Sequence, residues 1–169
     1  VSKKTAELLN FSYHVNFNMN IINLRLFSVY GKNQRPDLVI HKFFNQISQN
    51  KPIEIYGNEE TKRDYTYIDN VIEAVYNSVL HFENQKKNVY EIINIGNDKP
   101  ISLKVLLGYI KEIIQVADID FVTKDIAKGD AETTHADINK AKKLLNYNPS
   151  VSLNEGIRLF YVWFKTKKL

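Results

Sequence analysis

The chain has 169 residues, 44% of them hydrophobic and 25% charged, and its 23 Lys and Arg against 19 Asp and Glu give a formal net charge of +4. This is an ordinary globular composition, long enough for one domain with its own core. The absence of Cys excludes a disulfide framework, a thiolate metal site and a Cys nucleophile, and the four His are too dispersed to suggest a metal cluster.

The hydrophobic pattern predicts helices and strands in alternation. Apolar residues at helical spacing predict a helix over residues 2–15, and the Ile- and Leu-rich run at residues 21–26 predicts a buried strand. Further helices are predicted over residues 38–49, 70–82, 103–115 and 139–145, and from residue 152 or 154 to about 167. Further strands are predicted over residues 53–56, 63–68, 89–95 and 119–122, with a charged loop over 58–62 and an irregular polar loop over 125–135.

The predicted helix starts carry N-cap residues, with Asp69 and Ser102 before two of the helices and Ser152 or Asn154 before the last. The alternation predicts an α/β fold. In open α/β sheets, ligands bind outside the carboxyl ends of the strands. The polar loop 31–36, which holds Arg35, follows the buried strand 21–26 and therefore marks a candidate site. No Gly-rich phosphate-binding spacing occurs in the sequence.

Basic residues indicate further candidates. Only four of the 23 are Arg, namely Arg25, Arg35, Arg63 and Arg158. Since Lys fills nearly every generic basic position, an Arg points to two-pronged binding of carboxylate or phosphate. Arg25, within a buried strand, is expected to pair with a carboxylate. The Lys cluster near the C-terminus is interpreted as a solvated tail, so no nucleic-acid partner is expected. No apolar run approaches the roughly 20 residues of a membrane span and no signal peptide is visible, so we expect a cytoplasmic protein without a membrane partner.

Several motifs, in order along the whole chain, resemble one family. Residues 2–8 (Ser-Lys-Lys-Thr-Ala-Glu-Leu) resemble the start of the catalytic helix of extended short-chain dehydrogenases/reductases, in which a Tyr precedes the Lys by four positions. Residues 24–31 resemble the strand and loop that follow, and residues 63–69 (Arg-Asp-Tyr-Thr-Tyr-Ile-Asp) resemble a block of the nucleotide-sugar epimerases. Residues 94–96, 129–130, 136–137 and 140–141 resemble the family's later landmarks. Residues 31–37 and 52–57 are most similar to the UDP-glucuronate 4-epimerase branch.

The resemblance implies a fold, a domain organisation and a reaction. The chain resembles the C-terminal half of an extended Rossmann-type epimerase: residues 1–30 would be the last helix and strand of the NAD-binding domain. Residues 31–169 would be mainly the small α/β domain that binds the UDP-sugar, with some segments returning to the NAD-binding sheet. Most of the NAD site and the catalytic Tyr would lie outside the chain, which alone would be inactive. The intact enzyme would be a homodimer.

Site residues follow from the same resemblance, each with a plainer alternative. Lys3 would hold the nicotinamide ribose and lower the pKa of the Tyr, because a nearby cation favours an ionised phenol; otherwise it is a surface Lys. Phe27 and Ser28 would meet the nicotinamide and the sugar; otherwise Ser28 satisfies backbone groups at a strand end. Arg35 would face the sugar carboxylate; otherwise it is a solvated loop residue.

The nucleotide end of the site is implied in the same way. Tyr56 would stack on the uracil; otherwise it is a core residue. Arg63 would bind the diphosphate; otherwise it pairs with Glu59, Glu60 or Asp64. Asp130 would accept a hydrogen bond from the uridine ribose. The family usually has Arg or Gln three residues before it, whereas this chain has Ala127, followed by Lys128.

The implied function is NAD-dependent inversion at C4 of a UDP-sugar, supplying sugar nucleotides for surface polysaccharide, with UDP-glucuronate as substrate. Alternatives within enzymes are a UDP-hexose 4-epimerase and a sugar-nucleotide dehydratase or decarboxylase. An alternative of another class is an inactive UDP-sugar-binding remnant.

Overall fold

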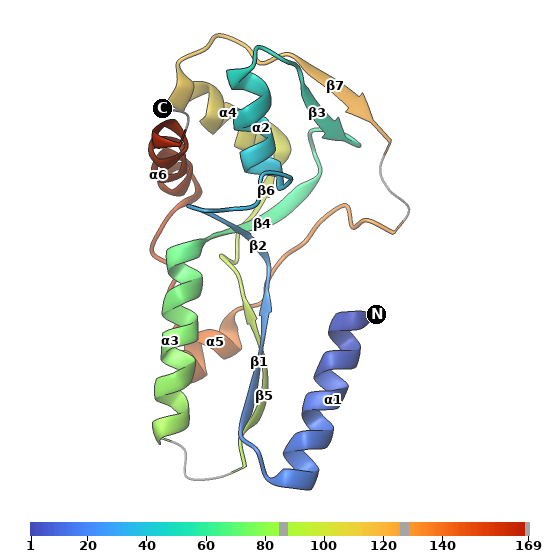
Figure 1. The fold of residues 1–169 in the computed structure, drawn as a ribbon, viewed down its shortest axis with the longest axis vertical. Helices are drawn as coiled ribbons and strands as arrows, with labels where there is room; N and C mark the ends of the chain where they lie inside the picture. Colours follow the sequence, from blue (N-terminus) through green and yellow to red (C-terminus); the bar gives the residue numbers. More distant parts are fainter. Residues whose placement is uncertain (85–87, 126–128, 168–169) are drawn as a thin grey trace.

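The computed structural model describes residues 1–84, 88–125 and 129–167 as an elongated α/β molecule with two parts along its length (Figure 1). Each part has its own hydrophobic cluster. Within these described residues, no helix combines the length and the apolar content of a membrane span.

The lower part in Figure 1 is a two-stranded parallel sheet between helices. Strand β1 (Ile21–Leu26) pairs with β5 (Tyr90–Ile95) in a register from Ile21 opposite Tyr90 to Leu26 opposite Ile95. Helices α3 (Ile68–Asn84) and α5 (Asn139–Leu145) lie on one face, and α1 (Ser2–Phe17) lies on the other. The apolar side chains of Ile22 and Leu24 pack into the cluster between the sheet and α3.

The upper part holds the remaining elements. Strand β2 (Ser28–Tyr30) runs parallel to β4 (Lys62–Tyr67), which pairs antiparallel with β6 (Pro100–Ser102). Strand β3 (Ile53–Tyr56) runs parallel to β7 (Phe121–Lys124). Helices α2 (Val39–Ser48), α4 (Leu103–Ile114) and α6 (Leu153–Thr166) pack around an aromatic-rich core. Fully buried members of this core include Tyr67, Phe43, Phe44, Phe160, Ile40 and Leu106.

The two parts meet at Phe27. Its backbone N–H still donates to the carbonyl of Ile95, at 3.0 Å, so β1 and β5 run together up to this residue. Ser28 then pairs with Tyr65, because β2 has left β5 for β4. One residue thus separates two strands that belong to different sheets, and Phe27 and Ser28 lie where the sheets part.

A buried carboxylate joins the two parts. Asp64, on β4, is fully buried. Its two oxygens accept the backbone N–H groups of Asn97, at 2.7 Å, and Ala136, at 3.0 Å. Asn97 follows β5 and Ala136 precedes α5, so one side chain anchors two of the chain segments that run between the parts.

Most of the expected elements are confirmed, and the exceptions are small. Ser102 and Ser152 cap α4 and α6, accepting the N–H groups of Val105 and Glu155 at 3.3 Å. The expectation for Asp69 is wrong: α3 already begins at Ile68, and Asp69 lies in its first turn. The strand predicted over residues 119–122 lies two residues later, as β7 over Phe121–Lys124. Strands β2 and β6 are not predicted from the sequence.

Candidate functional site

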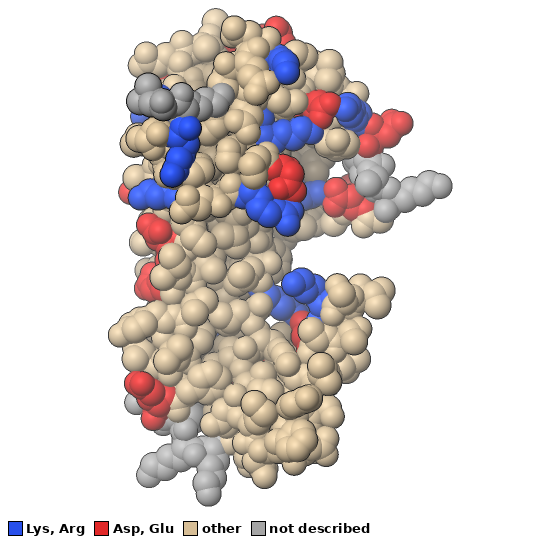
Figure 2. Space-filling view, viewed as in Figure 1, with Lys and Arg blue, Asp and Glu red and all other residues tan. Residues whose placement is uncertain are grey.

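Four adjoining hollows run from α1 to β3 and form one trough. The first lies between α1 and β1, the second at the end of β1, the third beside β2 and the fourth beside β3. Neighbouring hollows share lining residues: Arg25 joins the first two, Ser28 the second and third, and Arg63 the third and fourth. Figure 2 shows a hollow on the right of the molecule, with Lys, Arg, Asp and Glu side chains along its rim.

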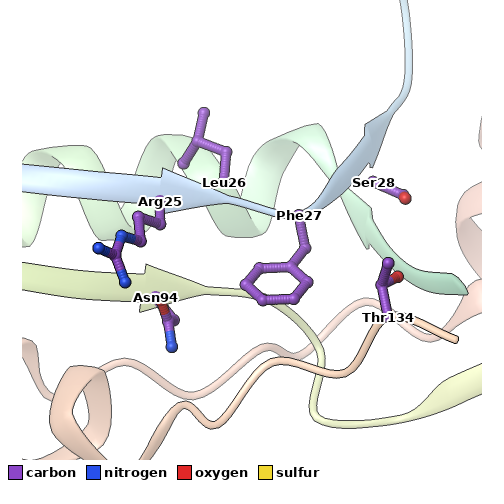
Figure 3. A pocket seen from close by; sticks show the side chains of 6 residues that line it. All are labelled: Arg25, Leu26, Phe27, Ser28, Asn94 and Thr134. Carbon is purple, nitrogen blue, oxygen red and sulfur yellow. The ribbon is translucent and has the colours of Figure 1, made fainter. Parts of the chain in front are cut away.

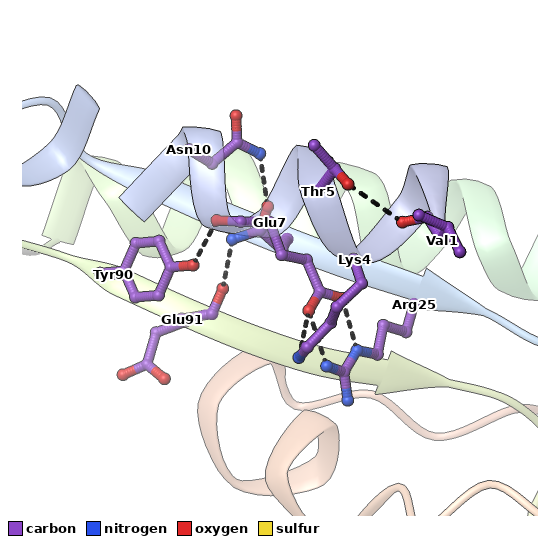
Figure 4. Close-up of polar contacts among 9 residues, drawn as sticks. Val1, Lys4, Thr5, Glu7, Asn10, Arg25, Tyr90 and Glu91 are labelled. Carbon is purple, nitrogen blue, oxygen red and sulfur yellow. Dashed lines mark hydrogen bonds and ion pairs between the residues drawn. The ribbon is translucent and has the colours of Figure 1, made fainter. Parts of the chain in front are cut away.

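The α1 end of the trough is basic and held by ion pairs. Lys3 lines this hollow together with Arg25. The Glu7 carboxylate accepts two hydrogen bonds from guanidinium nitrogens of Arg25, at 2.7 and 2.8 Å, and one from the ammonium of Lys4, at 2.9 Å (Figure 4). The hydrogen bond from Arg25, reinforced by Lys4, lowers the pKa of Glu7 to about 2. The expectation that Arg25 pairs with a carboxylate is therefore confirmed, and this network orients α1 over β1.

The sheet junction provides the middle of the trough. Phe27 and Ser28 line the second hollow, with Asn94 from β5 and Thr134 from the loop before α5 (Figure 3). The Ser28 hydroxyl makes no hydrogen bond to another described residue, so the alternative of a Ser that satisfies the backbone is not supported. Asn94 belongs to a motif noted in the sequence but was not predicted as a site residue, and Thr134 carried no sequence signal.

The loop after β2 places Asp37, and not Arg35, in the third hollow. Arg35 makes a two-pronged pair with Asp37, Nε to Oδ1 at 3.1 Å and a terminal nitrogen to Oδ2 at 2.7 Å. Asp37 lines the hollow with Ser28. The hydrogen bond from Arg35 lowers the pKa of Asp37. Both side chains are mostly exposed, so the pair is weak and can be exchanged for another carboxylate.

Arg63, Asp130 and Tyr56 come together in the fourth hollow, a cavity of about 190 Å³. A terminal nitrogen of Arg63 lies 3.3 Å from Asp130, and Arg63 also donates to the carbonyls of Lys62, at 2.9 Å, and Glu132, at 3.3 Å. The alternative pairing of Arg63 with Glu59, Glu60 or Asp64 is not found, since its acidic partner is Asp130.

Tyr56 is half exposed, so it is not a core residue. The ammonium of Lys42 lies 5.4 Å from the centre of its ring. Glu54, two residues earlier, accepts hydrogen bonds from both Lys42 and Lys124. These bonds lower the pKa of Glu54 to about 2, and the bond from Lys124 has the largest effect. The bridge ties α2, β3 and β7 together beside the tyrosine ring.

Besides Asn94 and Thr134, two further lining residues were missed by sequence reasoning. Tyr65 lines both the third and fourth hollows beside Arg63. The only indication of this role in the sequence is that Tyr65 belongs to the motif at residues 63–69. Gln34 lines the third, and its buried side-chain oxygen has no partner among the described residues, so it is ready to accept a ligand hydroxyl. The sequence departure at Ala127 and Lys128 lies outside the described residues.

An open parallel sheet with a trough at the ends of its strands defines an α/β ligand-binding protein. The model of the NAD dependent epimerase/dehydratase family matches residues 1–96. The chain belongs to this family.

Several similar proteins are named as nucleotide-sugar epimerases. The chain is 39% identical to a UDP-glucuronate 4-epimerase of Thermodesulfobacterium geofontis over 166 residues, which cover 97% of this chain and 49% of that protein. It is similar, with a TM-score of 0.88 and 35% identity, to the UDP-glucuronic acid 4-epimerase of Bacillus cereus in complex with UDP-glucuronic acid and NAD, covering 95% of this chain and 50% of that one. The UDP-glucose 4-epimerase of Thermotoga maritima with UDP-glucose has a TM-score of 0.85 at 28% identity, covering 98% and 52%. The chain thus spans about half the length of the relatives it matches.

Proposed function

We propose that the chain is part of an NAD-dependent UDP-sugar 4-epimerase that acts on UDP-glucuronate. The observation that carries this proposal is the order of residues along the trough. Lys3 lies at one end, Phe27 and Ser28 in the middle, and Arg63 with Tyr56 at the other end. This order suits a nicotinamide, a sugar, a diphosphate and a base.

In this proposal each residue has a defined task. NAD, when bound, would supply the hydride acceptor and donor for the inversion at C4 of the sugar. The ammonium of Lys3 holds the nicotinamide ribose and favours the ionised form of a catalytic Tyr supplied from outside these 169 residues. Ser28 and the unpaired oxygen of Gln34 orient sugar oxygens. Tyr56 offers an exposed ring for stacking on the uracil, and Asp130 accepts from the ribose.

The proposed division into domains follows the same trough. Residues 1–30 contribute the last helix and strand of the NAD-binding domain, and β5 and α5 return to it. Most of residues 31–169 form the substrate domain. A homodimer of the intact enzyme is proposed to use α1, because its apolar side chains Leu9, Tyr13 and Phe17 recur on one side of the helix and are about half exposed or more.

Substitution of Arg35 tests the substrate. Because a sugar carboxylate can take the place of Asp37 on the guanidinium fork, Arg35→Ala in the intact enzyme should lower kcat/KM for UDP-glucuronate by about 10-fold or more. Neutral UDP-sugars, which offer hydroxyls only, should be nearly unaffected. Arg35→Lys should restore activity only in part, since it keeps the charge and loses the fork. Steady-state kinetics with UDP-glucuronate and UDP-glucose measure the difference.

Equal losses on both substrates would contradict the glucuronate assignment and favour a UDP-hexose 4-epimerase. Arg158→Ala is the matched control, because Arg158 is also exposed and paired with a carboxylate, but neither Arg158 nor its partner Glu112 lines the trough, whereas Asp37, the partner of Arg35, does.

The 169 residues alone are proposed to be inactive and to bind NAD weakly. They contain no Gly-rich phosphate-binding loop, which in dinucleotide-binding folds presents backbone N–H groups to the pyrophosphate. Titration calorimetry of the 169-residue chain with NAD should therefore give no tight binding. Tight binding would show that the described trough suffices for the cofactor.

A further inference from the structure

We propose that His41, on α2, is a positioning residue for the sugar end of the trough: its ring holds the loop over residues 31–38 so that Gln34 meets a sugar oxygen. The inference rests on the proposed function, because the ligand of the third hollow is taken to be the sugar of a UDP-sugar. His41 does not line that hollow itself and acts through Gln34, which does.

The loop over residues 31–38 has one anchor inside the molecule. Of the described residues 32–38, Gln34 alone is not exposed. Its backbone N–H donates to the carbonyl of Gly31, at 3.2 Å, and its own carbonyl lies 2.8 Å from Nδ1 of His41. Its buried side-chain oxygen has no partner among the described residues. The backbone of Gln34 is therefore held on both sides, while its side chain is left to bind a ligand.

The ring of His41 is itself held by packing. Its centre lies 5.5, 5.7 and 5.6 Å from the ring centres of Phe160, Trp163 and Phe164 on α6, at interplanar angles of 70°, 84° and 88°. Three edge contacts of this kind leave the ring little freedom to rotate. Because a carbonyl only accepts, Nδ1 is the nitrogen that carries the proton in the hydrogen bond to Gln34. Helix α6 thus fixes the ring that fixes the loop.

The rest of the loop lies at the surface. Residues 35–38 are exposed, and the turn that they form is closed by a hydrogen bond of 3.2 Å from the N–H of Leu38 to the carbonyl of Arg35. A binding side chain has to be held within roughly 0.5 Å of its productive position by supporting contacts. Loss of the bond from His41 should therefore misplace Gln34 at the sugar end and leave the diphosphate and base end intact.

Two replacements of His41 in the intact enzyme separate the hydrogen bond from the packing. His41→Phe keeps an aromatic ring against α6 and removes the donor, whereas His41→Asn places an amide N–H near the position of Nδ1 and loses the ring. His41→Phe should weaken UDP-glucuronate about 3- to 10-fold and leave the affinity for UDP unchanged, because UDP has no sugar. His41→Asn should recover most of the affinity for UDP-glucuronate, although it unfolds at a lower urea concentration. Titration calorimetry and urea unfolding measure these effects.

A double-mutant cycle tests whether His41 acts through Gln34. Gln34→Ala alone should weaken UDP-glucuronate by a similar factor, and adding His41→Phe to it should cause little further loss. His14→Phe is the matched control: Nδ1 of His14 lies 2.7 Å from the carbonyl of Met19 and its ring packs against Tyr90, but His14 lines none of the four hollows of the trough. This variant should leave both affinities unchanged.

Hydrogen exchange at the amide of Gln34 decides the inference apart from the substrate. Exchange should be about 10-fold faster or more in His41→Phe than in the wild type and in His41→Asn. Equal exchange in the three proteins would overturn the inference, as would a greater loss of UDP-glucuronate affinity in His41→Asn than in His41→Phe, or independent losses in the cycle. An intact enzyme that inverts no UDP-sugar at C4 would contradict the proposed function, and the exchange rates would still decide whether His41 holds the loop.

Discussion

Arg63→Ala in the intact enzyme should weaken the binding of UDP and of UDP-sugars by the same factor, about 10- to 150-fold. The physical reason is the loss of charged hydrogen bonds worth roughly 1.5–3 kcal/mol to a phosphate, which is common to both ligands. Arg63 is suited to this role because its side chain is already held by two carbonyls and Asp130, so little rotamer entropy is lost on binding. Titration calorimetry with UDP and with UDP-glucuronate measures both affinities.

Two variants make this result specific. Arg63→Lys should recover part of the affinity, because the charge remains and the planar fork is lost. Arg158→Ala should leave UDP affinity unchanged, since Arg158 lies outside the trough. If UDP affinity stayed constant in Arg63→Ala while the preference among sugars moved, Arg63 would contact the sugar and not the diphosphate.

Asp64→Ala should destabilise the fold by about 3 kcal/mol or more, because a buried and a partly buried backbone N–H group both lose their carboxylate acceptor. Those groups belong to Asn97 and Ala136, on two of the segments that connect the parts of the molecule. Asp64→Asn should be destabilising as well, since an amide NH₂ placed against either N–H offers a donor where an acceptor is needed. Urea unfolding measures the free energy of unfolding of each variant.

Glu112→Gln provides the comparison for this loss. Glu112 forms an exposed ion pair with Arg158, and its replacement should change the free energy of unfolding little. If Asp64→Ala unfolded at the same urea concentration as Glu112→Gln, Asp64 would not anchor the two parts.

Sequence reasoning predicted the long elements because each has a clear physical signal. Helix α4 carries apolar residues at helical spacing behind a Ser cap, and β1 is a run of Ile and Leu. The three-residue strands β2 and β6 are too short to show a period, and what defines them is pairing with β4, a contact between distant segments. Asp69 failed as a cap because the chain passes from β4 into α3 without an intervening residue.

The candidate site shows the same limit. The Arg63 motif indicated a binding residue, and the structure adds Asp130, 67 positions further along the chain, as its neighbour. The sequence could not predict the ion pair between Arg35 and Asp37, because two opposite charges in one loop can point toward each other or away from each other. Thr134 reaches the trough only through the path of the loop before α5.

The single-residue step at Phe27 gives the trough a fixed length. Because β1 ends at Leu26 and β2 starts at Ser28, only one residue separates the hollow along β1, which Lys3 lines, from the hollow beside β2. The backbone therefore restricts how far apart the two ends of the trough can lie. We therefore expect a ligand that engages both ends to be selected by its overall length as well as by the side chains that it contacts.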